Sequence, residues 1–327
     1  MTDTASDLAV PTLPSVEMHL HRPNEPVEAT VVKNEVCTAS RKASGWVRHI
    51  EFDVSRTDIA GRFRAGQSFG VVPPGTTDKG VPHKVRLYSI SSPTRGEDGA
   101  GRTLATTVKR TIDEHWDDHS LFTGVASNYL CDREPGDTVM VAGPNGKRFL
   151  LPEDPSKHRF LFFATGTGIA PFRGMLGDLY GSGAASVAGS PPDATLVMGV
   201  PYATDLIYHN DLLELAGSPA PFSYLTAVSR ETQPDVDRRL YVQDRLETNR
   251  DELTALLEDE RTLVYICGIA GMELGIFQQL AACLPGSKLD AYLEVDPELA
   301  GVPPAEWTRK LIPRKLKPTK RVFLEVY

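Results

Sequence analysis

The chain has 327 residues, of which 41% are hydrophobic and 24% charged, and its formal net charge is −8. This length favours two domains of ordinary size. The acidic balance argues against a general affinity for nucleic acid. No segment approaches the run of about 20 apolar residues that a membrane-spanning helix needs, so we expect no membrane span.

The first part of the chain, residues 1–27, contains four prolines and no hydrophobic periodicity, so we expect a flexible N-terminal tail. It lacks the basic and apolar pattern of a secretory signal. The four cysteines, Cys37, Cys131, Cys267 and Cys283, form no CxxC pair, so no metal or iron–sulfur site is expected. Scattered thiols without a signal are typical of a cytoplasmic protein.

Short β-branched segments separated by turn residues occupy the next part of the chain. Strands are expected at residues 29–33, 46–54, 68–72, 85–90, 104–109 and 138–142. Strands of this length and spacing predict an antiparallel β-barrel, which we place in residues 28–154.

After Pro152 the pattern changes to apolar strands that alternate with helical stretches. Strands are expected at residues 160–164, 195–200, 222–228, 262–267 and 321–327. Helices are expected at residues 172–179, 205–216, 242–257 and 271–283. Fully apolar strands alternating with helices predict a parallel sheet with both faces covered, so residues 155–327 are expected to form an α/β domain.

The tetrapeptide Arg86-Leu87-Tyr88-Ser89 lies in a predicted strand. It offers an aromatic plate for a planar isoalloxazine, a cation for a pyrophosphate and a small hydroxyl. The alternative is an exposed barrel strand with a surface arginine.

A second motif, Gly124 to Leu130, is expected to open a helix with Ser127 as its N-cap. The backbone N–H groups at such a helix end can bind a pyrophosphate. The alternative is an ordinary capped helix.

Two further motifs indicate a dinucleotide. Thr165-Gly166-Thr167-Gly168 follows an apolar strand, at the strand end where α/β sheets bind ligands, although it is not a GxGxxG sequence. Farther on, a hydroxyl, two guanidiniums and a phenol could bind a phosphate dianion beneath a stacked adenine, and these are Ser229, Arg230, Arg239 and Tyr241. The alternative for this second set is a surface loop with scattered arginines.

Taken together, the ordered motifs resemble plant-type ferredoxin–NADP⁺ reductase over residues 29–327. The resemblance rests on the segments 82–92, 108–110, 127–132, 143–144, 166–173, 199–201, 227–231, 241–245, 267–268, 271–273 and 325–327. It implies an FAD-binding barrel followed by an NADP(H)-binding α/β domain.

The resemblance also implies a role for each matching residue. FAD would be bound by Arg86, Leu87, Tyr88, Ser89, Val108, Lys109, Val125, Ala126 and Ser127. NADP(H) would be bound by Thr167, Gly168, Ser229, Arg230, Arg239, Tyr241, Gly268, Met272 and Glu273. The implied catalytic residues are Ser89 near flavin N5, Cys267 against the nicotinamide, Glu325 near the flavin edge and Tyr327 over the flavin face that the nicotinamide must reach.

The implied function is a ferredoxin (or flavodoxin):NADP⁺ oxidoreductase, which exchanges a hydride between NADP(H) and FAD and single electrons with a carrier protein. The alternative is the NADPH-dependent reductase component of an oxygenase system, which would use the same residues. The expected partner is an acidic ferredoxin or flavodoxin that docks near the flavin edge of a monomer.

The chain departs from the family in two places. Asp113 stands where the family usually has an aromatic residue against the FAD adenine, and Trp116 is the candidate replacement. The basic and proline-containing segment 289–321 matches no family pattern that we recognise.

Overall fold

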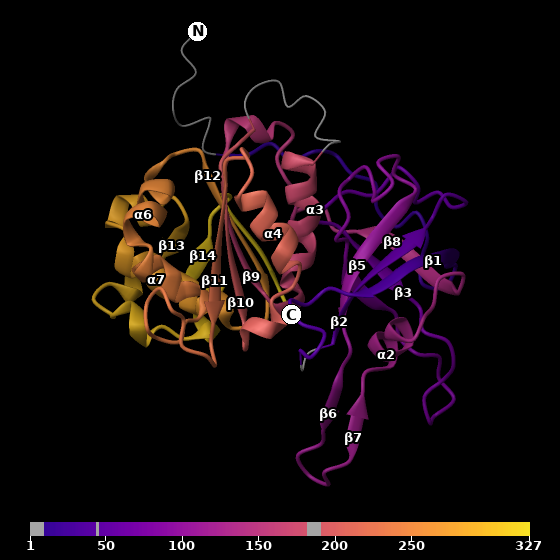
Figure 1. The fold of residues 1–327 in the computed structure, drawn as a ribbon. Helices are drawn as coiled ribbons and strands as arrows, with labels where there is room; N and C mark the ends of the chain where they lie inside the picture. The colour runs from indigo at the N-terminus through magenta and orange to yellow at the C-terminus, as the bar shows by residue number, and fades with distance from the viewer. Residues whose placement is uncertain (1–9, 44–45, 182–190) are drawn as a thin grey trace. The chain divides into compact units, whose positions relative to one another are not determined.

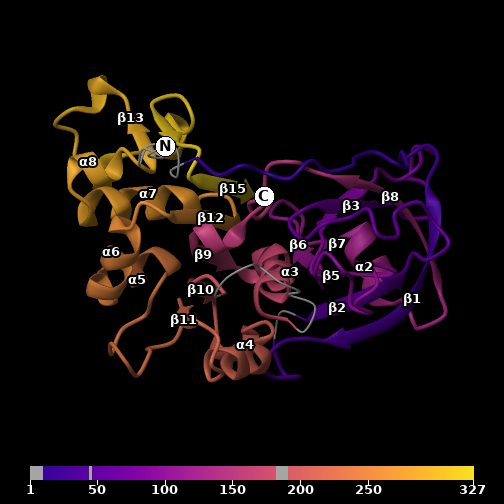
Figure 2. The ribbon, with the colours of Figure 1, turned by 90° about the horizontal axis from the view of Figure 1, so that it is seen from above.

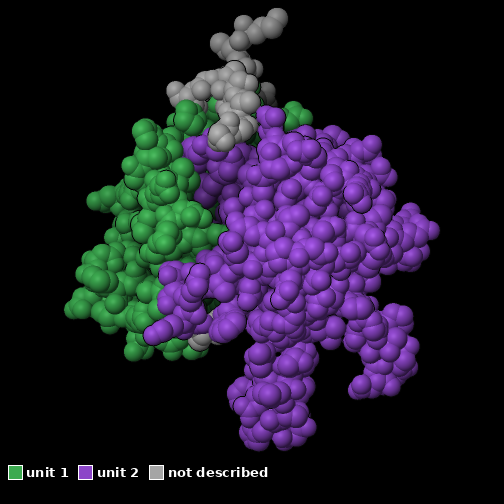
Figure 3. Space-filling view, turned by 45° about the vertical axis from the view of Figure 1, so that its right-hand side comes forward, with its two compact units in different colours: residues 1–13, 152–168, 186–327 green, residues 14–151, 169–185 purple. Residues whose placement is uncertain are grey.

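The computed structural model describes residues 10–43, 46–181 and 191–327 (Figure 1). These residues form two compact units, coloured separately in Figure 3. The described parts of unit 1 are residues 10–13, 152–168 and 191–327. Those of unit 2 are residues 14–43, 46–151 and 169–181.

Unit 2 contains a six-stranded antiparallel sheet with the strand order β4-β3-β8-β1-β2-β5. Its strands are β1 (Val27–Val36), β2 (Val47–Asp53), β3 (Ser68–Val71), β4 (Arg86–Ser89), β5 (Thr103–Lys109) and β8 (Thr138–Asn145). An isolated bridge between Ile90 and Thr106 joins the two ends of this order, which gives the sheet its barrel character. Buried side chains such as Ile50, Phe52 and Phe69 fill its interior. The predicted antiparallel barrel is confirmed.

Two helices and a hairpin complete unit 2. The helices are α2 (Val125–Cys131) and α3 (Ile169–Tyr180). The hairpin pairs β6 (Ile112–Glu114) with β7 (Leu121–Thr123) and extends away from the barrel strands (Figure 1). It was not predicted, because three-residue strands flanking an acidic, histidine-containing loop carry almost no alternation signal.

Unit 1 contains a five-stranded parallel sheet with the strand order β11-β10-β9-β12-β15. The strands are β9 (Arg159–Thr165), β10 (Ala194–Val200), β11 (Phe222–Val228), β12 (Thr262–Gly268) and β15 (Val322–Val326). Every residue of β10 and β12 is buried, as expected for strands covered on both faces. The predicted parallel α/β architecture is confirmed.

The helices of unit 1 cover this sheet, with α5, α6 and α7 on one face and α4 on the other (Figure 2). They are α4 (His209–Ala216), α5 (Arg245–Thr248), α6 (Arg250–Glu258), α7 (Met272–Cys283) and α8 (Gly286–Leu289). The single helix expected at residues 242–257 is in fact two, because Asn249 leaves helical geometry between them. None of the helices in the described ranges is long and apolar enough to cross a membrane.

The segment 289–321, which matched no recognised pattern, contains a small antiparallel pair, β13 (Leu293–Val295) and β14 (Leu316–Pro318). Three 3-10 turns lie between these strands in the described chain, Pro297–Leu299, Pro304–Glu306 and Arg309–Leu311. Trp307, between the last two turns, is buried in the same core as α7. This segment therefore packs as part of unit 1.

The predicted N-terminal tail lies partly outside the described residues, which exclude residues 1–9. Within the described part, the His19 N–H donates to the Pro144 carbonyl and the His21 N–H to the Gly143 carbonyl. These bonds run along β8 of unit 2.

Candidate active site

In the parallel sheet of unit 1, the order in which strands are added reverses between β9 and β12. The chain proceeds from β9 outward to β10 and β11, and then returns to add β12 and β15 on the other side. Such a switch point leaves space for a ligand at the carboxyl ends of the two central strands. The turns that follow β9 and β12 begin at this point, with Thr165-Gly166-Thr167-Gly168 and Cys267-Gly268.

The two turns touch each other so closely that only glycine fits. A Cβ atom on Gly168 would lie 2.2 Å from the Cys267 carbonyl oxygen. A Cβ atom on Gly268, whose φ is +144°, would lie 2.1 Å from Thr165 Oγ1. The Thr165 hydroxyl also accepts the Ile269 N–H at 2.9 Å. The switch point is therefore a fixed, backbone-lined surface rather than a loose pair of loops.

The C-terminal residue Tyr327 lies on this surface. Its N–H donates to the Gly268 carbonyl at 3.0 Å, and its carbonyl accepts the Ala270 N–H at 2.9 Å. Its phenol oxygen is 2.7 Å from Thr167 Oγ1. The residue is nevertheless 62% exposed, so its ring rests on the turn after β9 without being buried in the core.

Cys267 and Glu325 stand opposite each other in the register of β12 and β15. Cys267 is fully buried, and burial, followed by the nearby Glu325 carboxylate, raises the pKa of its thiol well above the ordinary value. Burial also raises the pKa of Glu325 to about 7. The structure therefore places a neutral thiol beside a carboxyl group that can exchange a proton near neutral pH.

Met272 and Glu273, at the start of α7, are both buried. The Thr165 hydroxyl lies 3.2 Å from Met272 Sδ. The Glu273 carboxylate accepts the Gly271 N–H at 2.6 Å and the Arg309 Nε–H at 2.7 Å. Both predicted residues thus support the turn after β12 from inside the unit.

Ser229, Arg230, Arg239 and Tyr241 belong to a loop after β11. The Ser229 N–H donates to the Val200 carbonyl, and the Arg230 N–H donates to the Pro201 carbonyl. The Arg230 guanidinium lies 5.7 Å from the centre of the Tyr202 ring. Tyr241 is 63% exposed.

Arg230 and Arg239 form no ion pair with an acid in the described parts of the chain. Two other charged residues of the loop do: Arg238 bonds Glu247 at 2.8 Å, and Asp235 bonds the buried Arg245 at 2.5 Å. The loop therefore presents two cations, Arg230 and Arg239, that are available to an anionic ligand. Its backbone is held by the bonds to Val200 and Pro201.

In unit 2, the tetrapeptide Arg86–Ser89 forms β4, which pairs with β3. Leu87 is 61% exposed, and the Arg86 guanidinium bonds the carbonyls of Lys84 and Val85, its own neighbours. Tyr88 packs partly against the barrel core, and burial raises the pKa of its phenol. The Ser89 carbonyl accepts a bond from the Thr106 hydroxyl at 2.8 Å.

The predicted N-cap role of Ser127 is wrong. Helix α2 begins at Val125 with Gly124 as its N-cap, so Ser127 lies inside the first turn. Its hydroxyl accepts the Thr111 N–H and donates to the Gly124 carbonyl, each at 3.2 Å. Gly124 holds the cap because a Cβ atom there would lie 2.6 Å from Ser127 Oγ.

The remaining residues predicted around FAD are divided between core and surface. Val108 and Ala126 are buried, whereas Val125 is 45% exposed and Lys109 is exposed. Arg110, which follows Lys109, donates to Asp132 at 2.5 Å.

The hairpin β6–β7 places an aromatic side chain, Phe122, opposite Asp113, in addition to the Trp116 that the sequence suggested. Asp113 pairs with Phe122 across the two strands, so the two side chains lie on one face. Phe122 is 47% exposed, Leu121 is 75% exposed and Trp116 is 97% exposed. The sequence analysis missed Phe122 because it is nine positions from Asp113 in the chain. The two residues become neighbours only when β6 and β7 pair.

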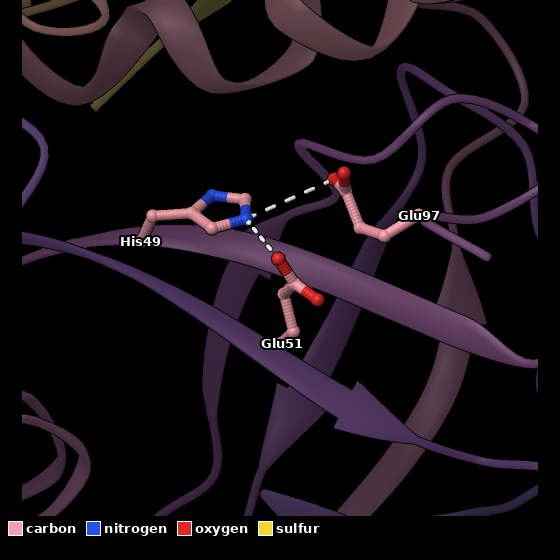
Figure 4. A group of neighbouring side chains, drawn as sticks. All are labelled: His49, Glu51 and Glu97. Carbon is pink, nitrogen blue, oxygen red and sulfur yellow. Dashed lines mark hydrogen bonds and ion pairs between the residues drawn. The ribbon is translucent and has the colours of Figure 1, made fainter. Parts of the chain in front are cut away.

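Among the described residues, one group has the side chains and spacing of a metal site, namely His49, Glu51 and Glu97 (Figure 4). His49 Nε2 lies 3.2 Å from the nearer oxygen of Glu51 and 3.8 Å from that of Glu97. Lys33 pairs with Glu51 at 3.4 Å, and Arg173 pairs with Glu97. An ion would have to displace these cations from the same oxygens, so we assign no metal.

Comparison with known proteins decides the family. The family described as "Oxidoreductase NAD-binding domain" matches residues 162–277. A ferredoxin–NADP reductase from Spirulina sp is 37% identical over 268 residues, covering 82% of this chain and 90% of that protein. The chain belongs to the ferredoxin–NADP reductase family.

Other relatives and structures agree. The chloroplastic ferredoxin–NADP reductase leaf isozyme 1 of Oryza sativa subsp. indica is 38% identical over 257 residues, covering 78% of this chain and 69% of that protein. A solved ferredoxin–NADP⁺ reductase from Plasmodium falciparum with 2'P-AMP has the same fold, with a TM-score of 0.67, 21% identity, and coverage of 94% and 99% of the two chains.

Family membership confirms the resemblance read from the sequence and the prediction of an FAD-dependent oxidoreductase that uses NADP(H). It does not favour the oxygenase-reductase alternative. The individual residue roles remain proposals.

Proposed function

We propose that this protein exchanges electrons between NADP(H) and a ferredoxin or flavodoxin through a bound FAD. The observation that carries the proposal is the backbone-lined switch point of unit 1, where Gly168, Gly268 and Tyr327 meet. It offers a backbone-lined surface for a dinucleotide, and the loop after β11 adds Arg230 and Arg239, which form no ion pair within the described ranges.

The β4 segment of unit 2 has the chemistry that FAD requires. Arg86 would bind the pyrophosphate by charge-assisted hydrogen bonds, Tyr88 would stack on the ring system, and Ser89 would hydrogen-bond near its N5. The exposed Leu87 would gain apolar contact. When bound, FAD supplies the conversion between two-electron and one-electron transfer.

In the β6–β7 hairpin, the partly exposed Phe122 and the exposed Trp116 are aromatic surfaces available to the adenine of FAD. Ser127 would act indirectly, because its hydroxyl already bonds Thr111 and Gly124, the two residues that flank the hairpin.

NADP(H) would lie across the switch point. Thr167 and Gly168 would bind its pyrophosphate with a hydroxyl and backbone N–H groups, while Ser229, Arg230, Arg239 and Tyr241 would bind the 2'-phosphate and adenine. The nicotinamide would lie toward Cys267, whose neutral buried thiol avoids placing a second negative charge near the reacting atoms.

Tyr327 would compete with the coenzyme, because its phenol already bonds Thr167. Tyr327→Ser removes both the ring and this bond and should tighten NADP⁺ binding, measured by titration of the flavin spectrum. Tyr327→Phe is the matched control, since it removes the bond but keeps the ring. If Tyr327→Ser binds NADP⁺ no more tightly than the wild-type protein, Tyr327 has a structural role instead.

The carrier would dock on exposed basic residues of unit 2, namely Lys84, Lys109, Lys147 and Arg148. Arg110 is not included, because Asp132 neutralises it. An acidic carrier would be attracted to these residues by forces that salt screens beyond about 8 Å.

The proposed function is tested by NADPH-dependent reduction of purified ferredoxins and flavodoxins at increasing ionic strength. We expect the KM for the carrier to rise with salt, and Lys147→Gln to mimic part of this rise, while the control Lys320→Gln does not. No reduction of any carrier would overturn the proposed function. A rate that is flat with salt would overturn the basic docking surface.

We further propose that the protein is a monomer in the cytoplasm, as the sequence suggests. The mass measured by light scattering on the FAD-loaded protein tests the first part, and fractionation of cells tests the second.

A further inference from the structure

The segment 304–311 runs along helix α7 and is attached to it at three points. Trp307 is buried in the core that α7 also lines. The Gln278 side chain of α7 donates to the carbonyls of Ala305, at 3.3 Å, and Trp307, at 3.1 Å. Two residues after Trp307, Arg309 bonds Glu273 at the start of α7. The segment thus reaches from the middle of α7 to its N-terminus.

The contact between Arg309 and Glu273 differs from an ordinary surface ion pair. The Glu273 side chain is only 3% exposed, whereas that of Arg309 is 56% exposed. A carboxylate removed from water requires compensating partners, and leaving it unpaired would be strongly unfavourable. Glu273 has two such partners at short distance, the Arg309 guanidinium and the Gly271 N–H.

Through Gly271, the Glu273 carboxylate acts on the turn after β12. Gly271 has a φ of +107° and ends the turn that Gly268 begins. Three other bonds anchor this turn: the Ile269 N–H donates to the Thr165 hydroxyl, the Ala270 N–H donates to the Tyr327 carbonyl, and the Gly268 carbonyl accepts the Tyr327 N–H. With the Glu273 bond, four anchors hold the turn, and one of them depends on Arg309.

We propose that Arg309 is a positioning residue for NADP(H): by holding the buried Glu273 carboxylate, it fixes the 268–271 turn in the shape that receives the nicotinamide half of the coenzyme. The inference rests on the proposed function, because that function places the nicotinamide beside Cys267 and Gly268. It also gives a role to the segment 289–321, which no sequence motif explained.

Loss of Arg309 should weaken binding of the nicotinamide half of the coenzyme and leave binding of the 2'-phospho-adenosine half unchanged. Without Arg309, the buried Glu273 carboxylate loses its charged partner and should turn toward solvent, which weakens or breaks its bond with the Gly271 N–H. The loop that carries Arg230 and Arg239 has its own supports, Arg245 and Asp235, and should keep its shape. NADP⁺ binding should therefore weaken, while binding of 2'-phospho-AMP, which lacks the nicotinamide, should not.

The experiment compares four FAD-loaded variants with the wild-type protein: Arg309→Gln, Arg309→Lys, Glu273→Gln and the double variant Arg309→Gln/Glu273→Gln. Lys310→Gln is the matched control. Lys310 is exposed and follows Arg309 directly, so this substitution removes the same charge from a neighbouring position. Dissociation constants for NADP⁺ are read from the flavin spectrum, and those for 2'-phospho-AMP from calorimetry. Flavin content and the thermal midpoint show that each variant is folded.

We expect Arg309→Gln to raise the NADP⁺ dissociation constant roughly tenfold, which corresponds to about 1.4 kcal/mol. Arg309→Lys should restore most of the affinity, and Lys310→Gln should not change it. The effect of Arg309→Gln should be smaller when Glu273 is already Gln, because the two residues act as a pair. If Arg309→Gln is too unstable to purify, the double variant, which buries no unpaired charge, tests the pairing instead: it should bind NADP⁺ as Glu273→Gln does, and a further loss of roughly tenfold would show that Arg309 does not act through Glu273.

Two results would overturn the inference: an NADP⁺ dissociation constant in Arg309→Gln within about twofold of the wild-type value, or an equal loss of 2'-phospho-AMP affinity. The second result would mean that Arg309 supports the unit as a whole. Failure of the wild-type protein to bind NADP⁺ would instead count against the proposed function, so the two failures are distinguishable.

Discussion

The proposed coenzyme site in unit 1 and the proposed flavin site in unit 2 are built in different ways. In unit 1 the turns after β9 and β12 press backbone against backbone at Gly168 and Gly268. In unit 2, strand β4 presents an exposed Leu87 and an Arg86 whose guanidinium bonds the neighbouring carbonyls of Lys84 and Val85. A site that a coenzyme enters and leaves is preformed, whereas a surface for a resident cofactor gains much of its packing from that cofactor.

The largest effect is expected from a change of backbone space in unit 1. Gly168→Ala would bring a Cβ atom to 2.2 Å from the Cys267 carbonyl oxygen, so the two turns must separate. We expect NADP⁺ affinity to fall roughly 100-fold, as misplaced binding groups commonly cause, with FAD content unchanged. Gly166→Ala is the control: it has a φ of +52° but nothing within 4 Å of the new atom, so NADP⁺ affinity should fall far less. Equal effects of the two substitutions would contradict a preformed site.

In unit 2 we expect FAD binding to depend on the charge of one side chain, the Arg86 guanidinium. Arg86→Ala should weaken FAD binding by roughly 1.5–3 kcal/mol, the usual loss for a hydrogen bond to a charged group. Fluorescence titration of the apoprotein with FAD measures this. Arg102→Ala removes an arginine that pairs with Asp98 in the same unit and should leave FAD binding unchanged. Unchanged flavin affinity in Arg86→Ala would remove this strand from the FAD site.

A smaller effect is expected at the edge of the coenzyme site. Arg230→Ala should lower kcat/KM for NADPH about tenfold and leave that for NADH nearly unchanged, because only NADPH carries the 2'-phosphate. Arg238→Ala is the matched control, since Glu247 already neutralises this arginine of the same loop. Equal use of the two coenzymes by the wild-type protein would contradict the assignment of this loop.

The last prediction concerns folding stability and pH, not ligand binding. Burial raises the pKa of Glu325 from 4.5 in the unfolded chain to about 7 in the folded one. The folded state therefore holds a proton that the unfolded state has lost, so stability falls as the pH rises through this interval. In Glu325→Gln this fall should be absent, and the difference between variant and wild-type protein in denaturant unfolding should appear only above about pH 4.5. A difference that does not change with pH would show that the Glu325 carboxyl is hydrated.

The sequence was most informative where function requires a fixed order of residues. Thr165 to Gly168 follows an apolar strand, and Cys267-Gly268 follows another, so their positions at strand ends could be read directly from the chain. The N-cap role of Ser127 could not, because a serine three residues after a glycine fits either position until the geometry of Gly124 is known. The hairpin β6–β7 was missed because its strands are too short to show periodicity.

The sequence by itself determined the two-domain architecture, the family and the set of chemically competent side chains, because these depend on local periodicity and on motifs of adjacent residues. Only the tertiary structure decided which distant residues meet: Gly168 with Cys267, Tyr327 with Thr167, Phe122 with Asp113 and Arg309 with Glu273. Each of these pairs depends on strand order, strand register or a helix contact, which are set by packing of the whole unit and leave no local signature in the chain.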